Sequence, residues 1–476
     1  MKGLFTSLLL VVPGMSGLMV PAAMADDESS CDPVETAKLL ASDGSESDYF
    51  GYSVAISGTT ALIGAFQDDD NGDSSGSAYV FELQQDGSWL ETAKLLASDG
   101  TLYDRFGYSV AISGTTALVG AYGDDDNGSS SGSVYIFEQQ EDDSWLSTAK
   151  LTASDGTSSD LFGRSVDISG TNALVGTTGE DDNGSLSGSA YIFEQQQDGS
   201  WLETAKLLAS DGASDDLFGD SVAISGTTAL IGAYRDDDDG TDSGSAYIFE
   251  QQQDGSWLET AKLRASDGVS SDFFGLSVAI SGNTALIGVY RDNAYRGSAY
   301  IFEQEQDGTW LEKTKLTASD GATDDKFGRS VAILGSTALV GASGDDDNGS
   351  ASGSAYIFEQ QDDGSWPETA KLLASDGAVT NQLGWSVAIS GTTALIGAPK
   401  DDDNGADCGS AYIFETACQC PDTNGDSLVD VTDALIVIDA WGDCGPDADC
   451  PADVDGDGLV NVNDLLLIIS EWGACQ

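Results

Sequence analysis

Short apolar runs alternate along the chain with clusters of Gly, Ser, Asp and Asn, and the alternation has a fixed period. Tryptophans mark this period, with steps of 56 residues interrupted by one step of 53: Trp89, Trp145, Trp201, Trp257, Trp310 and Trp366. The phrase GS(A/V)Y(I/V)FE occurs seven times, first at Gly76 and last at Gly409. Each repeat is therefore expected to form the same small structural unit.

Every repeat holds four apolar runs with strand character. In the second repeat the runs cover residues 109–113, 117–121, 133–138 and 145–151. In the third run, Val134 and Ile136 lie on one face of the predicted strand and Tyr135 and Phe137 on the other. A strand that is apolar on both faces is typical of sheets stacked face to face. The pattern predicts an all-β fold, a seven-bladed β-propeller with four-stranded blades.

The two ends of the repeat region indicate how the ring closes. The outer-strand phrase (T)AKL also occurs seven times, but its first copy, at residues 36–39, precedes every other element. The last repeat ends at residues 409–415 without such a strand. We therefore predict that the N-terminal strand supplies the outer strand of the last blade.

A paired FG…GA spacing, as in Phe106-Gly107 to Gly120-Ala121, resembles the FG-GAP repeats of integrin α-subunit propellers. The resemblance covers residues 34–415. Repeats of the integrin type carry a DxDxDG calcium loop between the first two strands of a blade. Here that connection is SGTT or a close variant, so calcium is not expected at that position.

The C-terminal segment contains two acidic windows, residues 422–433 and 453–464, each followed by an apolar stretch that ends in Trp-Gly. Oxygen ligands at positions 1, 3, 5, 9 and 12, with a backbone carbonyl at position 7, wrap a calcium ion. The predicted ligands are Asp422, Asn424, Asp426, Leu428, Asp430 and Asp433 in the first window, and Asp453, Asp455, Asp457, Leu459, Asn461 and Asp464 in the second. The sequence thus predicts two Ca²⁺ ions, the second bound more tightly because Gly458 occupies the sharp turn where the first window has Ser427.

The duplicated loop and helix, with Asp at the twelfth position, resemble a type I dockerin module. This resemblance implies attachment to a cohesin module of another secreted or surface protein. The pairs before the twelfth positions are Val431-Thr432 and Val462-Asn463 rather than Ser/Thr-rich, so a partner other than a cohesin stays open. The expected organisation is a signal peptide at 1–25, the propeller at 26–416 and the dockerin-like domain at 417–476.

Charge and composition narrow the location and the partners. The 476 residues include 81 acidic and 18 basic side chains, which makes nucleic acid a poor partner. Lys2, the apolar stretch 4–12 and the small residues around Ala25 predict a secretory signal peptide, and no other segment is apolar enough to span a membrane. Seven cysteines, five of them in the last sixty residues, fit disulfides in an oxidising compartment. A secreted, extracellular or cell-surface protein is expected.

The sequence offers few of the residue arrangements that enzymes use for catalysis. There is no histidine, so a Ser-His-Asp or Cys-His arrangement is absent from the sequence. Carboxylate pairs of the glycosidase kind are numerous, yet they repeat with the blades. We expect a non-enzymatic binding or adhesion protein whose propeller takes a protein or carbohydrate ligand. The alternative is an extracellular polysaccharide-degrading enzyme delivered by a dockerin.

Two features of the repeats are candidates for binding. Acidic runs such as Asp124–Asp126 lie between the second and third strands, either as solvated turns or as weak cation sites. Because few cations lie within these loops, we expect mutual repulsion that salt relieves. Positions that break the repeat, in the fifth acidic loop and directly after each FG, either reflect drift between duplicated repeats or line the axial mouth and hold a ligand. The candidates for binding are Arg291, Tyr295, Arg296, Arg164, Arg329 and Trp385.

Overall fold

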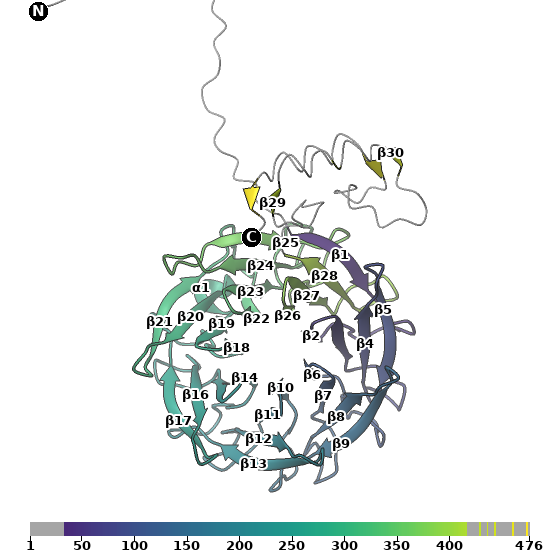
Figure 1. The fold of residues 1–476 in the computed structure, drawn as a ribbon. Coiled ribbons are helices and arrows are strands. Elements are labelled where there is room, and N and C mark those ends of the chain that lie inside the picture. Colours follow the sequence, from purple (N-terminus) through teal and green to yellow (C-terminus); the bar gives the residue numbers. More distant parts are fainter. Residues whose placement is uncertain are drawn as a thin grey trace, which may run out of the picture. The chain divides into compact units, whose positions relative to one another are not determined.

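Seven four-stranded antiparallel sheets surround a central axis, which confirms the predicted propeller (Figure 1). The computed structural model describes residues 33–416, together with 428–429, 436, 442–443, 459–460 and 473–474. In six of the blades the strands follow one another in sequence from the axis outward, and in the seventh the outermost strand comes from the N-terminal end of the propeller.

Four rings of strands make up the propeller. The innermost strands are β2 (Ser53–Ser57), β6 (Ser109–Ser113), β10 (Ser165–Ser169), β14 (Ser221–Ser225), β18 (Ser277–Ser281), β22 (Phe327–Leu334) and β26 (Ser386–Ser390). The second strands are β3 (Thr60–Ala65), β7 (Thr116–Ala121), β11 (Asn172–Thr177), β15 (Thr228–Ala233), β19 (Thr284–Val289), β23 (Thr337–Ala342) and β27 (Thr393–Ala398). The third strands are β4 (Ser77–Leu83), β8 (Ser133–Gln139), β12 (Ser189–Gln195), β16 (Ser245–Gln251), β20 (Ser298–Gln304), β24 (Ser354–Glu359) and β28 (Ser410–Glu415). The outer strands are β5 (Trp89–Leu95), β9 (Trp145–Leu151), β13 (Trp201–Leu207), β17 (Trp257–Leu263), β21 (Trp310–Leu316), β25 (Glu368–Leu372) and β1 (Val34–Leu39).

The ring closes as the sequence predicted. β1 pairs antiparallel with β28, with Val34 opposite Glu415 and Leu39 opposite Ala411. A parallel bridge between Phe50 and Gly409 joins the first blade to the last, and the same kind of bridge joins every other pair of neighbouring blades. The two ends of the propeller chain therefore lie in one sheet.

The hydrophobic core lies between neighbouring blades. Phe106 is fully buried and meets the rings of Tyr135 and Phe137 edge-on at centroid distances of 5.4 and 6.0 Å. The same cluster takes in Leu62 of the preceding blade, and Trp145 packs against it. Burying an aromatic side chain of this kind contributes roughly 2–3 kcal/mol, so the FG phenylalanines hold adjacent blades together.

The glycine of each FG pair allows a close approach of two backbones. Gly107 has a φ of +84°, and a Cβ at this position would lie 2.2 Å from the carbonyl oxygen of Ser77. Any larger residue would both strain the backbone and push the blades apart. The FG dipeptide is therefore a structural joint, as its repetition indicated.

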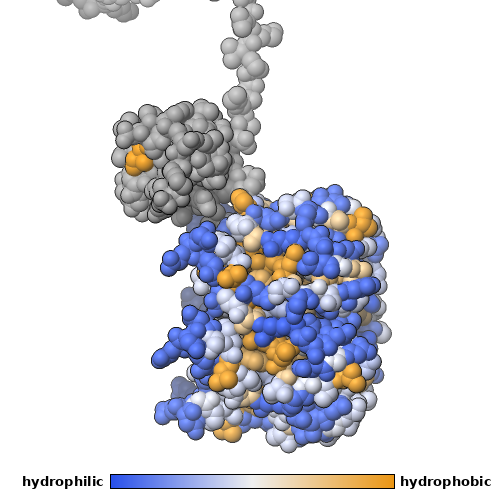
Figure 2. Space-filling model, turned by 90° about the vertical axis from the view of Figure 1, so that its right-hand side faces the viewer, coloured by the Kyte–Doolittle hydropathy of each residue, from blue (hydrophilic) through white to orange (hydrophobic). Residues whose placement is uncertain are grey.

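The side of the propeller is mostly hydrophilic, with separate small groups of hydrophobic residues (Figure 2). No helix among the described residues is long and apolar enough to cross a membrane. In the C-terminal segment, β29 (Leu428–Val429) pairs with β32 (Gly473–Ala474), and β30 (Gly442–Asp443) pairs with β31 (Leu459–Val460).

Candidate ligand-binding mouth of the propeller

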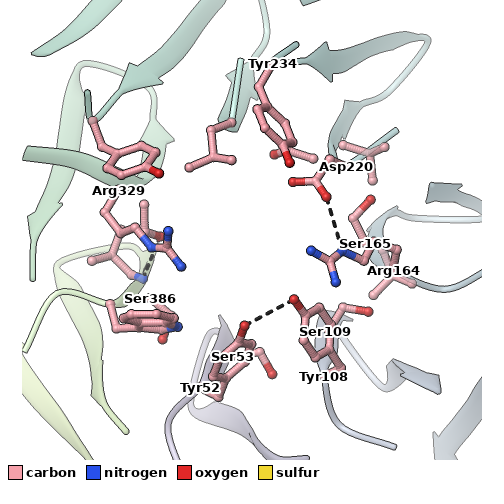
Figure 3. Close-up of a pocket in the computed structure, with 18 of the residues that line it drawn as sticks. Tyr52, Ser53, Tyr108, Ser109, Arg164, Ser165, Asp220, Tyr234, Arg329 and Ser386 are labelled. Atoms are coloured by element: carbon pink, nitrogen blue, oxygen red, sulfur yellow. Dashed lines mark hydrogen bonds and ion pairs between the residues drawn. The ribbon is translucent and has the colours of Figure 1, made fainter. Parts of the chain in front are cut away.

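One cavity of about 530 Å³ opens at the axis, on the face where the innermost strands begin. All seven residues that follow the FG or LG pairs line it: Tyr52, Tyr108, Arg164, Asp220, Leu276, Arg329 and Trp385. Figure 3 shows Arg164 and Arg329 on opposite sides of this mouth, with both guanidinium groups directed toward its centre. The residues after FG or LG therefore lie at the axis, and their binding of a ligand stays a prediction.

The fifth blade contributes only part of what the sequence suggested. Arg291 lines the mouth, whereas Tyr295 and Arg296 are not among its lining residues, and both are exposed. The short helix α1 (Asp292–Tyr295) has positive φ angles at Asn293 and Ala294, which make a tight turn. The Tyr295 ring lies behind the lining residues, with its centroid 5.3 Å from the guanidinium carbon of Arg291 and 6.1 Å from the Tyr290 ring.

Besides serines and valines of the innermost strands, four lining residues were missed from the sequence: Tyr234, Arg235, Phe273 and Tyr290. Tyr234 and Tyr290 directly follow the second strands β15 and β19, and Phe273 precedes an FG pair. They vary between repeats, as the residues after FG do, so variation alone could have identified them. Their rings form a chain with centroid distances of 5.0 Å (Tyr234 to Phe273) and 6.2 Å (Phe273 to Tyr290).

The arginines of this region rest on aromatic rings. The guanidinium carbon of Arg291 lies 3.8 Å from the centroid of Phe273, and that of Arg329 lies 4.0 Å from Trp385. Both carbons also lie 5.6 Å from the Tyr290 ring, so two positive charges flank one aromatic side chain. Stacking of this kind fixes a guanidinium plane while leaving its N–H groups available.

Carboxylates are almost absent from the mouth. Asp220 is the one acidic residue that lines it, and its Oδ1 accepts a hydrogen bond of 3.1 Å from Nε of Arg164. Burial works against the charge of Arg164, but Asp220 and nearby tyrosines raise its pKa above the ordinary value. Within residues 33–416, no carboxylate oxygen lies within 4.0 Å of the cationic groups of Arg235, Arg291 or Arg329. Although the chain has 81 acidic side chains, these three arginines make no ion pair with any acidic residue of 33–416.

The acidic runs are neither simple solvated turns nor open cation sites, because lysines of the outer strands bind their carboxylates. Asp124 is buried, and its carboxylate accepts hydrogen bonds from the Tyr135 hydroxyl (2.9 Å) and from Nζ of Lys150 (2.9 Å). The same ammonium contacts Asp126 at 2.6 Å and Asp99 of the preceding connection at 2.8 Å. Only Asp125, the middle residue of the run, is exposed without an ion pair in the described part of the chain.

This lysine cluster recurs in all seven blades. Its lysines are the last basic residues of the outer strands: Lys38, Lys94, Lys150, Lys206, Lys262, Lys315 and Lys371. The AKL strands thus supply one ammonium to each cluster, which the count of cations within the loops did not include, and the expected effect of salt stays a prediction. Burial lowers the pKa of Lys94, but hydrogen bonds to Asp43, Asp70 and Asp68 raise it above the ordinary value, so the ammonium stays charged.

Three of the clusters have carboxylates close enough to hold a metal ion: Asp155 with Glu180 and Asp182, Asp211 with Asp236 and Asp238, and Asp320 with Asp345 and Asp347. In each, one lysine Nζ lies within 2.9 Å of all three carboxylates. The protein's own ammonium group therefore occupies the place that a cation would take.

Below the mouth, an apolar channel of about 300 Å³ is lined by the Val-Ala-Ile residues of the innermost strands. Asp167 replaces the alanine in the third blade. Its carboxylate accepts hydrogen bonds from the backbone N–H groups of Ile168 and Ile224, at 2.8 and 2.7 Å. Burial nevertheless raises its pKa to about 6.

Of the predicted calcium ligands, the structure describes only Leu428, the first residue of β29, and Leu459, the first residue of β31. The other ten ligands, Asp422, Asn424, Asp426, Asp430, Asp433, Asp453, Asp455, Asp457, Asn461 and Asp464, lie outside the described residues.

Comparison with known protein families agrees with this architecture. The dockerin type I domain matches residues 421–471, which indicates calcium binding and attachment to a cohesin partner, as is typical of extracellular proteins. No curated protein matches the chain. The FG-GAP repeat matches seven segments, at residues 33–81, 89–137, 145–193, 201–249, 257–302, 310–358 and 366–414. These segments cover most of the sequence, and the chain belongs to the FG-GAP repeat family, with a type I dockerin domain at its C-terminus.

Proposed function

We propose that this is a secreted or cell-surface binding protein, in which the propeller mouth recognises a ligand and the dockerin domain attaches the protein to a partner. The observation that carries the proposal is the pair Arg291 and Arg329, which flank Tyr290 without a carboxylate partner in residues 33–416. Unpaired charges that stacking holds in a cavity contribute little to stability and are well placed for a ligand. Adhesion to another cell or to a matrix is one use of such a site.

The domain boundaries follow from the same proposal. A signal peptide at 1–25 would direct secretion, the propeller would span 26–416, and the dockerin domain would span 417–476. We propose two calcium ions in the latter, held by the two predicted ligand sets. The partner is a cohesin, or another surface protein that binds the helices predicted to follow the two calcium loops.

The rival function, a polysaccharide-degrading enzyme, has less support. Neither matched family is catalytic. A glycosidase also needs two carboxylates that face each other across the substrate. The mouth has Asp220, which is engaged by Arg164, and no second acidic lining residue.

A capture experiment with the full chain tests the two halves separately. Wild-type protein and the Trp385→Ala variant are each incubated with the surface fraction and the medium of the producing cell, with calcium or with a chelator. We expect one captured set that needs calcium but not Trp385, and a second set that needs Trp385 but not calcium. If Trp385→Ala and Arg329→Gln both leave every captured component unchanged, the mouth is not the ligand site.

A further inference from the structure

The mouth lies at the centre of a face that carries two opposite kinds of charge. The acidic loops belong to this face because they bond directly to the connections that lead into the mouth. The N–H of Tyr103 donates to the carbonyl of Asp73 (2.9 Å), and that of Phe106 donates to the carbonyl of Ser75 (2.9 Å). Each acidic loop therefore lies beside the segment that delivers a mouth residue.

One aspartate in each of six loops forms the outer part of this charge pattern, which we call the acidic rim: Asp69, Asp125, Asp181, Asp237, Asp346 and Asp402. All six are exposed, and none makes an ion pair with a described cation. In a cluster such as that of Lys150, one ammonium faces three carboxylates, so the clusters remain net negative and the rim adds to their charge.

The fifth blade interrupts the rim. Its loop has Arg291 and Asp292 in place of an acidic run, and Lys315 binds the Asp292 carboxylate. Arg235, from the fourth blade, and Arg329, from the sixth, lie on either side. The positive charges of the mouth therefore gather over neighbouring blades. We call Arg235, Arg291 and Arg329, with the rings of Tyr234, Phe273 and Tyr290, the arginine cluster.

This arrangement selects against most anions. At physiological salt the Debye length is about 8 Å, so a charge placed in the mouth is influenced by the groups around it. A polyanion would gain contacts with the arginine cluster and meet repulsion from the rim. A ligand that carries one carboxylate among basic groups is attracted twice: its carboxylate by the arginine cluster and its basic groups by the acidic rim.

The aromatic rings also argue against a sugar as the bound group. Arg291 covers a face of Phe273, and Arg329 covers a face of Trp385, at 3.8 and 4.0 Å. A sugar stacks on an open aromatic face, whereas a carboxylate binds to the N–H edges of stacked guanidinium groups. The rings therefore serve to orient the arginines.

We propose, on the basis of the binding function above, that the mouth accepts an acidic side chain of a protein partner, flanked by basic residues that face the acidic rim. The carboxylate takes hydrogen bonds from Arg291 and Arg329 beside Tyr290. The flanking lysines or arginines lie against the exposed aspartates. The partner is thus a basic protein surface with a single protruding carboxylate.

Fluorescence anisotropy with the full chain and labelled peptides, at constant calcium, tests this inference. The probe is a heptapeptide with blocked ends, one central glutamate, a serine on each side and two lysines at each end. We expect binding that weakens at least ten-fold when the glutamate is replaced by glutamine, because charge-assisted hydrogen bonds are lost. Binding should also weaken when the lysines are replaced by serine, and when salt is raised.

Protein variants locate the effect. Arg291→Gln with Arg329→Gln should weaken the glutamate peptide at least ten-fold and leave the glutamine peptide unchanged. Lys313→Gln is the matched control, because Lys313 is an exposed cation of the outer strand β21 that pairs with Glu305. It should leave both affinities unchanged.

Three results would overturn the inference. The glutamine peptide could bind as tightly as the glutamate peptide, an oligogalacturonate could bind more tightly than either, or no peptide could bind. The capture experiment is independent of these probes. Capture that depends on Trp385, together with any of these three results, would retain the binding function and reject the acidic side chain as the ligand.

Discussion

The lysines of the outer strands and the arginines of the mouth carry the same charge in opposite surroundings. Lys150 is held by three carboxylates within 2.9 Å, whereas Arg329 rests on Trp385 and Tyr290 with no carboxylate within 4.0 Å in residues 33–416. A lysine in such a cluster compensates charges that folding brings together. A stacked arginine keeps its hydrogen-bonding capacity for another molecule. The difference separates the cations that stabilise the propeller from those that we propose bind a ligand.

The largest expected effect is the loss of a cluster lysine. Lys150→Met leaves Asp99, Asp124 and Asp126 with no cation, and Asp124 is buried. We expect the free energy of unfolding to fall by about 3 kcal/mol, as when one partner of a buried ion pair is removed. Chemical denaturation measures it, with Lys150→Arg as the variant that retains the charge. A loss below about 1 kcal/mol would show that the clusters do not stabilise the blades.

Asp167 is an acid that, unlike Asp124, forms no ion pair with a cation of residues 33–416. Its folded-state pKa of about 6 exceeds the ordinary value of 3.8, so the folded protein binds the proton more tightly than the unfolded chain. The stability linked to protonation is fully present below pH 3.8 and is lost as the pH rises through 6. Asp167→Ala should therefore be about 3 kcal/mol more stable than the wild type at pH 8 and equal to it near pH 3.5. A pH-independent difference between the two denaturation profiles would contradict this account.

Removing a cluster lysine should also create a calcium site. In Lys262→Ala, the carboxylates of Asp211, Asp236 and Asp238 lose the ammonium that holds them together. Calcium at ten times its dissociation constant should then stabilise the variant by about 1.4 kcal/mol. Lys315→Ala is the control, because only Asp267 and Asp292 surround that lysine. Equal stabilisation of the wild-type propeller would show that the ammonium does not exclude calcium from the cluster.

The smallest effect is expected at Asp125, the middle residue of the run Asp124–Asp126. Asp125→Asn removes an exposed charge, while the side-chain oxygen can still accept the hydrogen bond from the Ser130 N–H. We expect a change of a few tenths of a kcal/mol in the free energy of unfolding. Asp124→Asn disturbs the contacts to Tyr135 and Lys150 and should cost about 2 kcal/mol. Similar losses of stability for the two variants would show that the run is a solvated turn in which no aspartate has a special role.

Much of the fold could be predicted because it is local and repeated. The alternation in residues 133–138 and the AKL copy at residues 36–39 gave the buried third strand and the ring closure, which the structure confirms. The charge balance could not be predicted in the same way. Lys150 meets Asp124 across 26 residues and Asp99 across 51, so the contact exists only once a blade and its neighbour have formed. From the sequence, the lysine was only part of a strand signature.

The mouth was predicted in part for a related reason. Deviation from the repeat pointed to Arg164, Arg329 and Trp385, because positions after FG share one place in every blade. It also pointed to Tyr295 and Arg296, whose places depend on the tight turn after Arg291. The rings that orient the arginines come from different repeats, and their packing follows from the curvature of the whole ring.

The central claim, that one set of cations stabilises and the other binds, is tested most directly by measuring stability and binding on the same two variants. Lys150→Met and Arg329→Gln are each subjected to denaturation and to titration with the glutamate peptide. The account predicts a crossed result: Lys150→Met loses about 3 kcal/mol of stability with its affinity retained, and Arg329→Gln keeps its stability within about 0.5 kcal/mol and loses affinity. If both variants lost stability and affinity in parallel, the division between the two sets of cations would be wrong.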